Sequence, residues 1–77
     1  MEQKQKPNHV GQLAIVSREI SVAGTGEISY EQLGKHVSIT ARALSEKLVL
    51  VGADVVIDRI GNGIAFVEEW SEVEQRL

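Results

Sequence analysis

Two carboxylates, Asp54 and Asp58, are the nearest that this sequence comes to a catalytic pair. They stand two positions either side of Val56 in an apolar run, which places both on one face of a strand. Paired carboxylates act as general acid and base only when a nucleophile, a metal ligand or an acid partner is directed at the same point. The sequence directs no such group at them, so we expect two solvated strand residues and no catalytic residue.

The two histidines do not indicate a metal site. His9 and His36 are far apart in the sequence, neither has clustered carboxylates beside it, and the chain has no cysteine. No Gly-x-Ser-x-Gly motif marks a hydrolase nucleophile either. We therefore expect no metal, no cofactor and no enzyme activity.

Size and charge narrow the class of protein. A chain of 77 residues forms one domain at most, and its 43% apolar and 25% charged residues are ordinary for a globular protein. The net charge of -3 argues against nucleic acid as the main partner, because binding to a phosphate backbone depends on Lys and Arg. Apolar runs such as Leu48–Val51 are far shorter than the ~20 residues of a membrane-spanning helix.

The stretch Gly24–Ala43 predicts a β-hairpin around which the domain is built. Gly24 and Gly26 allow a backbone kink before the first strand, and a four-residue turn is expected at Glu31–Gly34. The second strand alternates with a period of two, which indicates one buried and one solvated face. The residues predicted to be buried are Val37, Ile39, Ala41 and Ala43, and the solvated ones are Ser38, Thr40 and Arg42.

Three further strands are predicted around this hairpin. Val10–Ile20 contains four consecutive apolar residues, which favours a strand buried on both faces. That strand is expected to bend or bulge, with Ile20 and Val22 resuming the alternation on one face. Ala53–Ile60 and Ile64–Val67 flank Gly61–Asn62–Gly63, a signal for a type I′ turn.

The connector Leu44–Gly52 is ambiguous between a helical turn that Ser45 would cap and a strand. We favour an irregular plug in which Leu48 and Leu50 close one end of the barrel. Phe66 is the largest candidate for the core. Together these elements predict an all-β fold, a small five-stranded OB-like barrel over residues 10–69.

Both ends of the chain are expected to lie outside the barrel. Residues 1–9 are polar and predict a disordered linker. Residues 70–77 form an acidic tail in which Trp70, Val73 and Leu77 follow at spacings of three and four. Such a tail either forms a short helix that docks on a partner or frays, with Trp70 packed back on the barrel.

Some apolar and aromatic residues have no expected place in the core, and these are our candidates for partner-binding residues. They are Tyr30, Leu33, Trp70, Val73 and Leu77. Leu33 lies at the expected hairpin tip, and Trp and Tyr are common anchors of protein interfaces. The alternative function for such a barrel is binding of single-stranded nucleic acid, which needs at least two exposed aromatics for stacking. The aromatics available for it are Tyr30, Phe66 and Trp70.

A series of short motifs follows in order along the predicted barrel. They are Gly11, Gly24-x-Gly26-x-Ile28, Ala41–Arg42–Ala43, the run Val51–Ile57, Gly61–Asn62–Gly63 and Val67–Glu68. In this order and spacing, the segment from about Val10 to Glu69 resembles the C-terminal soluble domain of NfeD-like membrane proteins. It departs from the pattern of many members at Arg18–Val22, which has no proline.

This resemblance implies a bacterial or archaeal membrane protein whose transmembrane helices lie outside this chain, with the barrel on the cytoplasmic side of the cell membrane. It also implies a partner, a flotillin-like (SPFH) membrane scaffold, and a role in organising membrane microdomains. We therefore expect a non-enzymatic protein-interaction domain. The serine-protease domain of some longer family members has no counterpart in the motifs of this chain.

Overall fold

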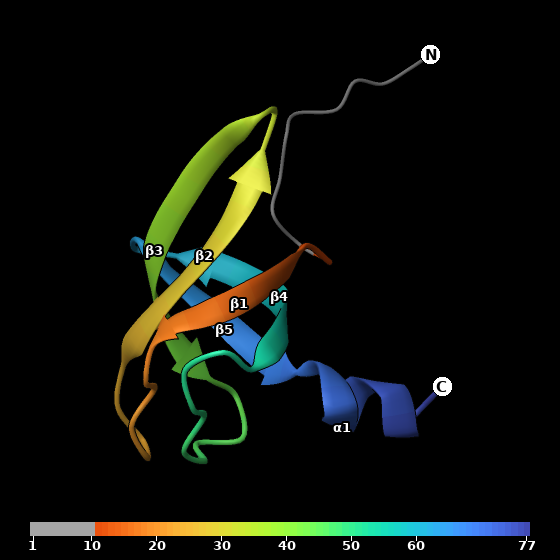
Figure 1. Cartoon of the computed structure of the whole chain (residues 1–77). Helices are drawn as coiled ribbons and strands as arrows, with labels where there is room; N and C mark the ends of the chain where they lie inside the picture. The colour runs from red at the N-terminus through yellow and green to blue at the C-terminus, as the bar shows by residue number, and fades with distance from the viewer. Residues whose placement is uncertain (1–10) are drawn as a thin grey trace.

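The computed structural model describes residues 11–77, and Figure 1 shows them as a small β-barrel followed by one short helix. The linker predicted for residues 1–9 lies outside the described residues. The described elements are β1 (Leu13–Arg18), β2 (Gly26–Gln32), β3 (Lys35–Ala43), β4 (Asp54–Gly61), β5 (Ile64–Glu69) and α1 (Trp70–Gln75).

The five strands close into a barrel in the order β1-β2-β3-β5-β4. β1, β2 and β3 form an antiparallel meander, β3 runs parallel to β5, and β5 forms a hairpin with β4. Antiparallel pairing of β1 with β4 closes the barrel. This is the strand order of the OB fold, so the predicted five-stranded OB-like barrel is confirmed.

The β2–β3 hairpin has the predicted inward and outward faces. Ala41 and Ala43 are buried, and Val37 and Ile39 pack against the core. Ser38 is on the outer face, where its hydroxyl lies 3.3 Å from that of Ser29 on β2. The period of two in this strand therefore gave the correct register.

Both hairpins turn on two residues with left-handed backbone. The Asn62–Gly63 turn between β4 and β5 has φ values of 54° and 77°, as predicted for a type I′ turn. The turn between β2 and β3 is shorter than predicted, because strand pairing continues to Gln32 and Lys35. Leu33–Gly34 alone makes this turn, with φ values of 53° and 79°.

The beginning of β2 crosses close to the end of β1. A Cβ on Gly26 would clash with the carbonyl oxygens of Arg18 and Glu19, which are backbone atoms that cannot rotate away. The β1–β2 register shifts between Val16 and Arg18, so the expected bulge in the first strand is present. Gly26 is therefore required by the close approach of two backbones.

One apolar core fills the barrel, and no polar side chain of the described residues is buried. Most of its members are small or β-branched, which suits the narrow interior of a five-stranded barrel. The core residues are Ala14, Val16, Ile20, Ile28, Tyr30, Ala41, Ala43, Val49, Val55, Ile57, Ala65 and Val67.

β1 is buried on one face only, and the prediction that both faces are buried is wrong. Ala14 and Val16 point into the core, whereas Leu13 and Ile15 are 55% and 51% exposed. The reason is that the barrel wall is a single layer with no described element packed over β1. Alternate residues of that strand must therefore face outward, apolar or not.

The connector between β3 and β4 closes one end of the barrel through a different residue from those predicted. Leu48 and Leu50 are exposed, and Val49 between them is buried. Val49 forms a short bridge with Ile20, with backbone hydrogen bonds of 2.9 and 3.0 Å. Val22 does not share the buried face with Ile20 as predicted, because the chain has already entered a turn there and Val22 is exposed.

Phe66 lies on the outer wall of the barrel, and its predicted place in the core is wrong. The inward positions of β5 belong to Ala65 and Val67, which are fully buried. The period of two then directs Phe66 outward. Its ring is half-buried and lies under the side chain of Arg59 on β4.

Candidate interaction surface

The residues that could have formed a catalytic or metal site do not converge. Asp54 and Asp58 are both exposed, and the side-chain carboxylate of neither forms a hydrogen bond or an ion pair within residues 11–77. In the same range, no three His, Asp or Glu side chains are grouped closely enough to hold a metal ion. The described residues also enclose no pocket.

Tyr30, a predicted partner-binding residue, is part of the core. It lies on the same inward face of β2 as Ile28 and is only 5% exposed. Burial raises the pKa of its hydroxyl above the ordinary value of 10.0. Its ring is therefore not available as a surface anchor. Of the three aromatics proposed for stacking on bases, the half-buried Phe66 and Trp70 remain.

Leu33 is at the tip of the β2–β3 hairpin, as predicted, and is 86% exposed. Figure 1 shows this tip projecting from one end of the barrel, while α1 lies beyond the opposite end. The structure therefore does not bring Leu33 together with Trp70, Val73 and Leu77.

Helix α1 begins directly after β5 and packs against β4 and β5. Trp70 and Val73 are half-buried, whereas Leu77 lies beyond the end of the helix and is 88% exposed. The predicted short helix is present, but the apolar stripe that was predicted to reach Leu77 ends at Val73.

Two ion pairs connect α1 and its C-terminal end with the rest of the domain. The ammonium of Lys47, in the connector, lies 3.3 Å from a carboxylate oxygen of Glu72. The guanidinium of Arg76 lies 3.0 Å from Glu68 at the end of β5. Both basic side chains are well exposed, so the pairs add little stability. The positive charges of Lys47 and Arg76, next to this acidic helix, are nevertheless already paired with carboxylates.

The sequence did not predict the exposed leucine and isoleucine on β1. Leu13 is paired with Val56 of β4, and Ile15 with Asp54, so these side chains stand next to one another on the outer wall. Alternation along a strand requires Leu13 and Ile15 to face the side opposite to Ala14 and Val16, but it does not say which side faces outward. Because all four residues of the run Leu13–Val16 are apolar, the sequence gives no signal for the outward side.

These observations define a class of protein: a closed OB-like barrel with a C-terminal helix and an apolar outer strip. A scan of family profiles and a search of curated proteins found no match. Two solved structures do resemble the chain. The soluble domain of the NfeD protein YuaF from Bacillus subtilis is 28% identical, with a TM-score of 0.69, and the match covers 78% of this chain and 71% of that one.

The second structure is the C-terminal domain of stomatin operon partner protein 1510-C from Pyrococcus horikoshii. It is 16% identical, with a TM-score of 0.65, over 84% of this chain and 95% of that one. At this identity the likeness is one of fold. The chain therefore has the OB-like barrel found in the soluble domains of NfeD proteins, as the resemblance in its motifs implied. No helix within residues 11–77 is long and apolar enough to cross a membrane.

Proposed function

We propose that this chain is the protein-interaction domain of a membrane-anchored NfeD-like protein. In this proposal its partner is an SPFH scaffold of the flotillin or stomatin type, and it helps to organise membrane microdomains without catalysing a reaction. The barrel is held at the cytoplasmic side of the cell membrane by transmembrane helices outside this chain. The observation that carries the proposal is the likeness in fold and sequence to the soluble domain of an NfeD protein.

The distribution of apolar side chains supports an interaction role. Single exposed leucines are normal on a soluble domain, but exposed apolar residues that gather on one face mark interaction sites. Leu13 and Ile15 on β1 gather in this way, next to Val56. The nearby acidic helix also gives the surface a charge that selects among partners.

A pull-down tests the proposal. The tagged chain is incubated with a purified flotillin-like protein and, separately, a stomatin-like protein from the same source. We expect one of them to be retained. Failure of the folded chain to retain either protein at micromolar concentration contradicts the proposal.

Variants of the chain show which predicted residues take part. Leu33→Ser and Trp70→Ala, each first shown by circular dichroism to be folded, are compared with Val22→Ser as a surface control. Reduced retention by either of the first two, with Val22→Ser unchanged, assigns that residue to the interface. Undiminished binding by both removes the hairpin tip and Trp70 from it.

A further inference from the structure

An apolar strip runs across the outer wall of the barrel where β1 meets β4. Leu13 and Ile15 point outward from β1 and are more than half exposed. The β1–β4 register places Val56 opposite Leu13, and directly opposed side chains in an antiparallel pair have Cβ atoms about 5 Å apart. These three side chains therefore form one continuous apolar surface.

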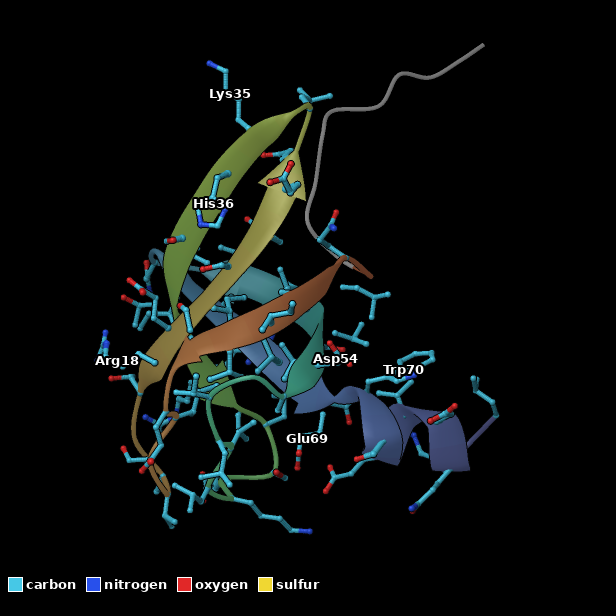
Figure 2. The ribbon with its side chains drawn as sticks, in the orientation of Figure 1. Arg18, Lys35, His36, Asp54, Glu69 and Trp70 are labelled. Carbon is cyan, nitrogen blue, oxygen red and sulfur yellow. The ribbon has the colours of Figure 1, made fainter. Side chains whose placement is uncertain are left out.

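Helix α1 extends this strip. Glu69 pairs with Val55, so the next residue, Trp70, is carried alongside Asp54 at the beginning of β4. Figure 2 shows the Trp70 side chain on the side of α1 that faces Asp54. Val73 follows three positions later, which places it on the same face of the helix as Trp70. We call the surface formed by Leu13, Ile15, Val56, Trp70 and Val73 the β1–α1 face.

Two carboxylates flank the β1–α1 face on the side of α1. Asp54 lies beside Trp70, and Glu74 lies in the last turn of α1, four positions after Trp70 and so on the same side of the helix. Neither carboxylate forms an ion pair within residues 11–77, whereas Glu68 and Glu72 are already paired with Arg76 and Lys47. The basic side chains labelled in Figure 2, Arg18 and Lys35, lie at the far edge of the barrel and at the hairpin tip. The rim of the face is therefore negatively charged.

The strand pairing restricts how a partner can bind here. β1 is hydrogen-bonded to β2 on one side and to β4 on the other, so the centre of the face presents no free strand edge. A partner strand therefore cannot add to the sheet at this place. What the face offers is side chains, and an amphipathic helix binds through side chains, by laying its apolar stripe on an apolar surface.

We propose that the β1–α1 face binds an amphipathic helix of the partner whose apolar stripe is flanked by Lys or Arg. This inference rests on the proposed function and names the element of the partner that the barrel recognises. The carboxylate rim selects for positive flanks and disfavours a second copy of this chain, because two identical negative rims would repel each other. For the same reason it disfavours an anionic membrane surface.

The test uses the isotope-labelled full chain and two synthetic peptides. Each peptide has about 18 residues, long enough to form a helix. Both share a leucine stripe, which is flanked by Lys in one peptide and by Glu in its twin. Titration of the Lys peptide is expected to shift the amide signals of β1, β4 and α1 and to leave those of Leu33–His36 unchanged. The Glu twin is expected to bind at least about tenfold more weakly, as loss of charge-complementary contacts implies.

Substitutions localise the binding. Ile15→Ser and Leu13→Ser each remove an exposed apolar group and are expected to weaken the Lys peptide several-fold without unfolding the chain. Asp54→Lys is expected to reduce the preference for the Lys peptide over its Glu twin. Val22→Ser, an exposed apolar residue outside the face, is the matched control and should bind as the unaltered chain does.

Several outcomes overturn the proposal. Equal binding of both peptides removes the role of the rim, and shifts confined to the hairpin tip place the site elsewhere. Concentration-dependent shifts of the face in the absence of peptide would identify a second copy of the chain as its occupant. Contacts between residues 1–10 and the face would identify a segment of the same chain as its occupant. Shifts of the face on addition of anionic vesicles identify a lipid surface. Because no SPFH protein is used, failure here leaves the pull-down result unaffected, and a failed pull-down leaves peptide binding unaffected.

Discussion

The guanidinium carbon of Arg59 lies 4.2 Å from the centroid of the Phe66 ring, on the outer wall of the barrel. The β4–β5 register pairs these two residues directly. The register of β4 shifts between Ile57 and Arg59. After this irregularity the side chain of Arg59 points outward and lies over the outward-facing ring of Phe66. A cation–π contact at an exposed site contributes about 0.5–1 kcal/mol.

We predict that Phe66→Ala costs less stability than Ile57→Ala. Ile57 is fully buried, and its truncation leaves a cavity that costs about 2–5 kcal/mol. Phe66 is half-buried, so its loss is expected to cost about 1–2 kcal/mol including the contact with Arg59. Urea unfolding of both variants measures the difference, with Arg59→Ala as the control for the contact alone. An equal loss of stability in Phe66→Ala and Ile57→Ala would show that Phe66 is part of the core.

Gly26→Ala is predicted to be strongly destabilising, although it adds a single methyl group. The new carbon would clash with the carbonyl oxygens of Arg18 and Glu19, so β1 and β2 would have to separate. We expect a loss of about 2–4 kcal/mol, in the upper range for single substitutions. Gly61→Ala is the matched control, because a Cβ at Gly61 meets no atom within 4 Å. Similar unfolding midpoints for the two variants would contradict the close approach.

Most of the fold could be predicted because its strongest signals are local. The alternation in β3 and the Asn62–Gly63 turn each depend on neighbouring residues, and both are confirmed. The two faces of β1 could not be assigned, because the run Leu13–Val16 has no polar residue to mark the outward side. Tyr30 was predicted to lie outside the core, but it is buried. It stands two residues after Ile28 and therefore shares the inward face of that residue.

The candidate surface was predicted only in part. The spacing of Trp70 and Val73 indicated the helix, and the structure contains it. The neighbouring residues Leu13 and Ile15 could not be linked to that helix, because the link passes through the registers of β1 with β4 and of β4 with β5. Such pairings join residues distant in the sequence, and a single sequence carries no signal for them.

Stability is predicted to fall at alkaline pH through Tyr30. Burial raises the pKa of Tyr30, so the folded chain holds this proton more tightly than the unfolded chain does. The resulting stabilisation is fully present below pH 10.0, the ordinary value, and is lost as the pH rises through the higher pKa of the folded state.

Two measurements check this. Tyr30 is the only tyrosine of the chain, so tyrosinate absorbance reports its pKa without ambiguity. The urea midpoint of the unaltered chain should decrease more steeply above pH 10.0 than that of Tyr30→Phe, in which other titrating groups are unchanged. Parallel decreases in the two proteins would contradict a buried phenol.

The tip of the β2–β3 hairpin has an unfavourable backbone conformation at Leu33. Leu33 has a φ of 53°, and left-handed backbone costs an L-residue other than glycine about 1–2 kcal/mol. Asn tolerates this conformation and is favoured in type I′ turns, so Leu33→Asn is expected to stabilise the chain by about 0.5–1 kcal/mol. The exposed side chain makes no compensating contribution to the core, since Leu33 is 86% exposed.

Urea unfolding of Leu33→Asn and Leu33→Ala tests this expectation. Leu33→Ala removes the same side chain but keeps the unfavourable backbone, so its stability should stay close to that of the unaltered chain. If both variants are destabilised, the leucine side chain contributes to folding by more than its left-handed backbone costs. If Leu33→Asn is more stable but is retained less well by the SPFH protein, the tip keeps a strained leucine because it binds a partner.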